Sequence, residues 1–343
     1  MIYPPKSQPG DRVAVLSPSN GNPSRFPHVY ELGLARLRDE LGLIPVEYPH
    51  TRIKATPAER AADLHAAYAD PTITAIMATI GGEDQITVLK YLDVDLIKAH
   101  PKPFFGYSDN TNLLNFLHFH GIVGYHGGSV MVHLGRSGRT HPDTMASLRA
   151  ALFTSGWYDL TPASVWTDES HSWADPEMLT VEPDSYPGDG WIWHNADRVV
   201  EAPTWGGCVE IIPWILQAGK HVPPDADLDG GILLLESSED MPRAGQIYWD
   251  LRAMGERGLL GRFAAVVVAR PKAWERSSQN TPAQKEEYAQ AQREAVLRAL
   301  SAYAPDAMAV FNVDFGHTDP QLVLPYGGDI RIDGPNRTIA VRY

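Results

Sequence analysis

A serine, a glutamate and a histidine with the chemistry needed for acyl transfer lie far apart in this chain. Ser108 follows the short apolar stretch 103–107 and precedes a helix-like run at 110–120. A serine hydroxyl is a poor nucleophile near neutral pH and needs an adjacent base and donors for the oxyanion that forms. A strand-to-helix corner would expose Ser108 beside the free N–H groups of the first helical turn. The pattern predicts a nucleophile, but Ser-Asp-Asn-Thr is also typical of a simple helix cap.

Two backbone positions could supply the oxyanion donors. The N–H of Asp109 follows the serine directly, and the pair Gly81-Gly82 ends a neighbouring predicted strand, where a backbone without side chains can approach closely. The G-x-S-x-G elbow of α/β-hydrolases is not met, because Asn110 stands at the second glycine position. We therefore expect Asp109 with Gly81 or Gly82 at the oxyanion, and disfavour an unrelated α/β-hydrolase.

The candidate base is His317, one of thirteen histidines, in a loop directly after a predicted buried strand. A hydrogen-bonded structural histidine is the alternative. Glu236 follows four apolar residues, and an acid at a buried strand end is costly unless it is paired. Pairing with a histidine N–H would satisfy the acid and fix the tautomer of the ring. Glu239, Asp240 and Asp314 compete with Glu236 for this orienting role.

The composition excludes several classes of protein. The net charge of −13 would repel nucleic acid and anionic membranes. A single cysteine, Cys208, allows no disulfide within the chain and no cysteine zinc cluster, and no H-x-x-x-H spacing occurs. We expect neither a metal nor a cofactor. The first residues do not resemble a secretory signal and no apolar run reaches membrane-spanning length, so we expect a cytoplasmic protein.

Alternating strand and helix patterns over residues 1–155 predict a flavodoxin- or Rossmann-like α/β domain with a parallel sheet. Residues 156–203 contain five tryptophans without a persistent period, which we interpret as a loop covering the site. Residues 204–343 predict a second, smaller α/β domain. Ligands of parallel sheets bind beyond the carboxyl ends of the strands, where the sequence puts Ser17, Gly81, Gly82 and Ser108.

Three segments carry a family resemblance across nearly the whole chain: IGGEDQITVLKYLDVDLIKAHPKPFFGYSDNTNLL, LLLES and NVDFGHTDPQLVLPYGG. They resemble the LD-carboxypeptidase serine peptidases. GYSD, the tryptophan-rich insert and the length resemble the microcin C self-immunity branch more than the murein branch. The resemblance implies a cytoplasmic homodimer, a triad of Ser108, Glu236 and His317 assembled across two α/β domains, and oxyanion donors at Asp109 and Gly81 or Gly82.

The resemblance implies cleavage of an amide next to a free carboxylate, in a peptidyl or aminoacyl nucleotide. Murein tetrapeptide trimming is one alternative, and a two-domain small-molecule binding protein is another. Trp191 and Trp193 could stack an aromatic base or merely anchor their loop. Trp205 and Cys208 are further expected substrate contacts. Cys208 stands where many relatives carry asparagine, and an inert buried thiol is favoured over a second nucleophile.

Overall fold

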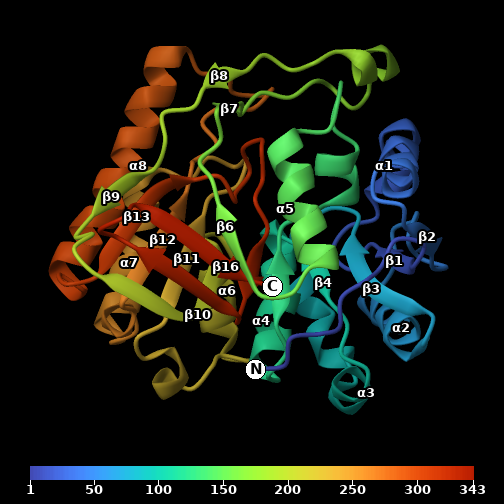
Figure 1. Cartoon of the computed structure of the whole chain (residues 1–343), viewed down its shortest axis with the longest axis horizontal. Helices are drawn as coiled ribbons and strands as arrows, with labels where there is room; N and C mark the ends of the chain where they lie inside the picture. The colour runs from blue at the N-terminus through green and yellow to red at the C-terminus, as the bar shows by residue number, and fades with distance from the viewer.

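The computed structural model describes residues 1–343 and contains two large β-sheets (Figure 1). Five of the six strands in the first sheet are parallel to their neighbours, and the sixth, from the C-terminal part of the chain, is antiparallel. In spatial order they are β2 (Ile44–Glu47), β1 (Arg12–Leu16), β3 (Ile73–Ala78), β4 (Phe104–Gly106), β5 (Gly124–His126) and β14 (Leu324–Tyr326). The predicted parallel N-terminal sheet is confirmed, with β14 as an addition.

Helices follow most strands of this first sheet. The start of α2 (Pro57–Ala69) is determined by local sequence alone. Thr56 and Glu59 exchange side-chain-to-backbone hydrogen bonds in a capping box, and Pro57 occupies the first helical position. The five helices are α1 (Pro27–Asp39), α2 (Pro57–Ala69), α3 (Val94–Ala99), α4 (Thr111–Phe119) and α5 (Pro142–Phe153). None of the helices in the protein combines the length and the apolar character needed to cross a membrane.

The second sheet has eight strands, of which the central four are parallel and the others antiparallel. In spatial order they are β6 (Trp157–Leu160), β16 (Thr338–Arg342), β15 (Asp329–Asp333), β10 (Val199–Cys208), β11 (Ile232–Glu236), β12 (Ala265–Ala269), β13 (Met308–Val313) and β9 (Ile192–His194). The helices of this part are α6 (Ile211–Ala218), α7 (Ala244–Glu256) and α8 (Pro282–Tyr303). A second α/β sheet domain is therefore confirmed, although its sheet is not the smaller one.

Alternate residues of each central strand enter different halves of the apolar core. In β1, Val13 and Val15 belong to one buried cluster, whereas Ala14 and Leu16 belong to another, as the period of two demands. Both clusters continue from the first sheet into the second. The two sheets are thus joined by shared apolar packing, which fixes how the ends of their strands face each other.

The division of the chain between the two sheets differs from the prediction. Segment 156–203 is not wholly irregular, because β6, β9 and the first part of β10 already belong to the second sheet. β6 and β9 are edge strands, and the first part of β10 is half exposed. Their alternation of apolar and polar residues is therefore weak in the sequence. Between them lies a short antiparallel pair of strands, β7 (Val165–Trp166) and β8 (Tyr186–Pro187), whose long connection contains a 3₁₀ turn. Figure 1 shows this insert crossing the top of the molecule from α8 towards α1.

Candidate active site

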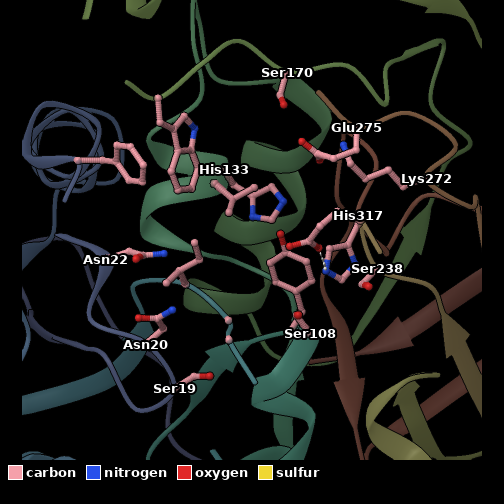
Figure 2. A pocket seen from close by; sticks show the side chains of 18 of the residues that line it. Ser19, Asn20, Asn22, Ser108, His133, Ser170, Ser238, Lys272, Glu275 and His317 are labelled. Carbon is pink, nitrogen blue, oxygen red and sulfur yellow. Dashed lines mark ion pairs between the residues drawn. The ribbon is translucent and has the colours of Figure 1, made fainter. Parts of the chain in front are cut away.

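A cavity of about 1260 Å³ lies at the carboxyl ends of the parallel strands of both sheets (Figure 2). Its wall includes residues that follow β1, β3 and β4 in the first sheet and β10, β11, β12 and β13 in the second. Residues 167–174 of the insert line it as well. Small-ligand pockets usually measure roughly 300–1,000 Å³, so this space can hold a substrate larger than a dipeptide.

Ser108 lies on the cavity wall, two residues after Gly106 ends β4 and directly after Tyr107. Its φ of 62° is a left-handed backbone conformation, which costs free energy for any residue except glycine. The hydroxyl does not cap the helix that follows: neither the 3₁₀ turn Ser108–Asn110 nor α4 has a side-chain cap. The helix-cap interpretation of Ser108 is therefore wrong, and the strained corner leaves its hydroxyl free.

The corner is held by the residue after the serine. Asp109 is fully buried, and its carboxylate accepts hydrogen bonds from Ser19 Oγ, from the Gln85 N–H at 2.9 Å and from Asn112 Nδ2 at 2.8 Å. Burial raises the pKa of Asp109, which these donors oppose. The side chain thus has a structural role, while its backbone N–H stands next to the serine.

Gly81 packs directly against the serine. A Cβ added to Gly81 would lie 2.9 Å from Ser108 Oγ, so only glycine allows this approach. A Cβ added to Gly82 would instead lie 2.6 Å from Ser19 Oγ, and no atom of Ser108 is among its nearest neighbours. Neither glycine N–H is used in a hydrogen bond within the protein. Of the two glycines, Gly81 is the one that packs against Ser108.

His317 and Glu236 form a buried pair across the strand ends of the second sheet. His317 Nδ1 lies 2.6 Å from Glu236 Oε2, and Glu236 is 1% exposed. Burial alone would lower the pKa of His317, but the charge of Glu236 and this hydrogen bond raise it to about 9. Burial would likewise raise the pKa of Glu236, whereas the charge of His317 and contacts with both His317 and His126 hold it at about 2. Of the competing acids, Asp314 instead pairs with Arg270.

The other ring nitrogen of the pair faces the cavity. His317 Nε2 lies 3.3 Å from Glu239 Oε2, which is half exposed. The ring of Tyr107, the residue before the serine, lies against the His317 ring with centroids 4.7 Å apart. Figure 2 shows Ser108 and His317 at the same end of the cavity. Ser108 and the His317–Glu236 pair thus lie at one end of the same cavity, although they come from distant segments of the chain.

Cys208 also lines the cavity but is poorly suited to attack. Its thiol is 1% exposed and donates to Glu210 Oε2 at 3.1 Å. Burial, followed by the charges of Glu236 and Glu210, raises the pKa of Cys208 well above its usual value. A thiol that stays protonated is a weak nucleophile. Cys208 thus fits the inert role that the sequence favoured.

The three tryptophans expected to contact substrate do not line the cavity. Trp191 is 9% exposed within the apolar core, and Trp193 lies in β9, where its backbone pairs with Val310. Trp205 is 1% exposed and donates its Nε1–H to Asn115 Oδ1 at 2.9 Å. None of the three therefore reaches the cavity wall: Trp191 and Trp205 are buried in the apolar core, and Trp193 packs half-buried against it.

Two other tryptophans reach the cavity wall, Trp173 of the insert and Trp214 of α6. Trp173 packs edge-on against Phe26, with ring centroids 5.5 Å apart, so it also attaches the insert to the first domain. Trp214 is 40% exposed. Either ring presents an aromatic surface that the sequence analysis assigned to other positions.

Two further polar residues line the site: His133, which the sequence made only a weak loop candidate, and Lys272, which it did not single out. His133 lines the cavity, and its Nδ1 accepts a hydrogen bond from the Ser129 N–H at 3.1 Å. Burial, followed by the charge of His317, lowers the pKa of His133 to about 3, so its ring is neutral. Lys272 lies three residues beyond the end of buried β12, a signal that could have identified it. No group of three or more histidine, cysteine or acidic side chains is arranged to hold a metal ion.

Comparison with known families agrees with this architecture. Family models described as the LD-carboxypeptidase N-terminal domain and the LD-carboxypeptidase C-terminal domain match residues 13–127 and 201–332. Together these matches cover well over half of the chain. The chain belongs to the LD-carboxypeptidase family. It is accordingly a peptidase, as the sequence predicted.

Relatives of this LD-carboxypeptidase fall on both branches considered above. The Microcin C7 self-immunity protein MccF of Escherichia coli is 26% identical over 287 residues, 82% of this chain and 78% of that protein. The structure of MccF in complex with aspartyl sulfamoyl adenosine has a TM-score of 0.85 at 23% identity, covering 100% of this chain and 99% of that one. A murein tetrapeptide carboxypeptidase of Pseudomonas aeruginosa is 34% identical over 108 residues, 31% of this chain and 35% of that protein.

Proposed function

We propose that this peptidase is a serine hydrolase in which Ser108 is the nucleophile, His317 the base and Glu236 the residue that orients the base. The observation that carries the proposal is the 2.6 Å contact of His317 Nδ1 with buried Glu236, in a cavity that the strained Ser108 also lines. The contact leaves Nε2 as the nitrogen available to the serine hydroxyl.

The reaction proceeds through an acyl-enzyme. Ser108 Oγ bonds to the amide carbon while its proton passes to His317 Nε2. The C–N bond then breaks, and the leaving amine takes that proton. Water attacks the resulting ester, gives a proton to Nε2, and Ser108 recovers it as the acid departs. Glu236, with its pKa near 2, stays ionised throughout and stabilises the imidazolium.

The oxyanion that forms in both half-reactions needs preorganised donors. We assign this role to the N–H groups of Asp109 and Gly81, with Gly82 as the second possibility along the same loop. The close approach of Gly81 to Ser108 and the unused glycine N–H groups support the assignment. Each such donor contributes about 10²–10³ in rate in serine hydrolases.

For the substrate we propose an amide next to a free carboxylate in a peptidyl or aminoacyl nucleotide. The similarity to MccF, whose structure contains aspartyl sulfamoyl adenosine, supports this class. A cavity of about 1260 Å³ has room for both an acyl part and a nucleoside. Trp173 or Trp214, rather than the tryptophans first considered, would then stack the base, worth about 1–3 kcal/mol. The implied homodimer remains a prediction, which light scattering can measure.

Murein tetrapeptide trimming is the second candidate, favoured by the similarity to the Pseudomonas aeruginosa enzyme. A pure binding protein is less consistent with the site, because it would have no use for a strained serine beside a charged histidine pair.

Incubating the protein separately with a muropeptide tetrapeptide and an aspartyl adenylate analogue, and analysing products by mass spectrometry, tests the proposal. We expect cleavage of the nucleotide conjugate and none by Ser108→Ala. Release of D-alanine without nucleotide cleavage would replace the first candidate with the second. Turnover of neither substrate by the wild type, with tight binding of both, would favour the binding protein.

A further inference from the structure

Lys272 is a buried cation of the cavity wall that makes a single hydrogen bond. It follows β12 and is 7% exposed, and Figure 2 shows it on the His317 side of the cavity. Its Nζ donates one hydrogen bond, to the backbone carbonyl of Asp168 at 2.6 Å, and forms no ion pair with a carboxylate. An ammonium has three N–H donors, so two of them have no partner in the protein.

The other largely buried basic side chains of the wall are neutralised. Arg60 pairs with Asp84 at 2.8 Å and Arg136 with Asp319 at 2.6 Å. Burying a charge without a counter-ion is expensive, and proteins normally avoid it. The exposed cations of the wall also form no ion pair, but water solvates their charge. These residues are Arg25, Lys54 and Arg276. Lys272 is therefore the buried positive charge of the cavity that a ligand could complete.

Acidic side chains occur around the whole wall, and two of them lie close to the catalytic pair. Glu239 is 3.3 Å from His317 Nε2, and Glu210 hydrogen-bonds to Ser238 and Cys208 on the same side. An anionic group of the substrate would be repelled there. Burial lowers the pKa of the Lys272 ammonium. The charges of Glu275, Asp168 and Glu239 offset this effect only in part. An anion bound directly to Nζ would offset it further.

We propose that Lys272 binds an anionic group of the substrate, a terminal carboxylate or a phosphate-like group, and thereby sets how the substrate lies along the cavity. The proposal rests on the proposed function, because it takes the cavity to be the substrate site. The neutral or cationic part of the substrate then faces Glu210 and Glu239, and the anion faces Lys272. A charge-assisted hydrogen bond to an anion can provide this discrimination.

Lys272 also contacts the insert through Asp168, so its loss could act indirectly by loosening the insert. Lys285 provides a matched control. It is another buried lysine that holds Asp168, by an ion pair at 2.7 Å, and it does not line the cavity. A change at Lys285 should loosen the insert without removing a charge from the substrate site.

The experiment measures binding by calorimetry, so it does not depend on turnover. Two pairs of probes differ only in an anionic group: L-alanyl-D-alanine against its C-terminal amide, and adenosine 5′-monophosphate against adenosine. We expect wild type to bind the anionic member of at least one pair more tightly. Lys272→Met should reduce that preference about 10- to 100-fold, as expected for a lost hydrogen bond between charged groups. Lys272→Arg and Lys285→Met should keep it.

Loss confined to the dipeptide pair would identify a carboxylate site, and loss confined to the nucleotide pair a phosphate site. An unchanged preference in Lys272→Met, an equal loss in Lys285→Met, or no anion preference in the wild type would overturn the proposal. If Lys272→Met fails to give a cooperative melt, Lys272→Gln serves in its place. Loss of preference in a protein that hydrolyses no substrate would keep the anion site and reject the proposed catalysis.

Discussion

The two ends of the candidate site are built in different ways. At the end of β4, backbone geometry dominates: Ser108 has a φ of 62°, Gly81 packs against it, and buried Asp109 fixes the turn. At the end of β11, charge dominates, because Glu236 and His317 form a buried ion pair from segments far apart in the sequence. We call the first the geometric end, because it depends on backbone shape, and the second the charged end, because it depends on protonation. Substitutions at the two ends should therefore affect activity in different ways.

The largest effect should come from removing either reacting group. Ser108→Ala and His317→Ala should each lower kcat by about 10⁴-fold or more, because each removes the covalent route. The double variant should be little worse than either single one, since the two act as a unit. Single-turnover kinetics, with thermal melts of each variant as a control for folding, measures these losses. Additive losses in the double variant would show that Ser108 and His317 act independently.

The second-largest loss of activity should come from removing the carboxylate charge at the charged end. Glu236→Gln keeps the size of the side chain but removes the charge that raises the pKa of His317. We expect kcat to fall by about 10³-fold, because the imidazolium formed during the reaction is no longer stabilised. Asp314→Asn, at the acid that pairs with Arg270 instead, is the comparison. A comparable kinetic loss there, without a loss of stability, would move the orienting role to Asp314.

The geometric end should respond to a single methyl group. In Gly81→Ala the new Cβ would lie 2.9 Å from Ser108 Oγ and must displace the serine or the glycine loop. Displacement of about 1 Å in a reacting group can cost about 10²-fold in rate. Gly245→Ala in α7, where the nearest atom would be 3.9 Å away, is the control. The pH profile of Gly81→Ala should have the same midpoint as that of the wild type. A shifted midpoint would show that the geometry around Ser108 also affects the protonation of His317.

The smallest effect concerns pH. With the pKa of His317 raised to about 9, the ring is mostly protonated at neutral pH, so kcat/KM should rise with pH towards a plateau above about pH 9. Charged groups around the ring are Glu236, Glu239, Glu210 and, when protonated, His133.

Glu239→Gln removes one of these negative charges and should move the midpoint of the profile to lower pH. The shift should be less than about one unit, because the carboxylate is half exposed. At neutral pH the rate should therefore increase a few-fold. Asp240→Asn, an exposed neighbour that forms no ion pair with His317, should leave the profile in place. A midpoint near pH 6.5 in the wild type would contradict the raised pKa.

Much of the geometric end could be predicted from sequence because it is local. The capping box at Thr56, the strand and helix around Ser108 and the glycine pair depend on residues within one or two turns of each other. Their periods of two and 3.6 residues are legible without knowledge of the fold. The helix-cap alternative for Ser108 could not be removed in this way, because the same residue types serve both roles.

The sequence by itself determined the α/β class, the family and a short set of candidate groups, since these depend on local periodicity and on signature segments. Only the tertiary structure decided that Glu236 rather than Asp314 contacts His317 and that Lys272 forms no ion pair. It also decided that Trp191, Trp193 and Trp205 do not line the cavity. The reason is physical. Those outcomes depend on which strand ends meet when two sheets pack through a shared core, and residues 81 positions apart carry no local pattern that records their distance.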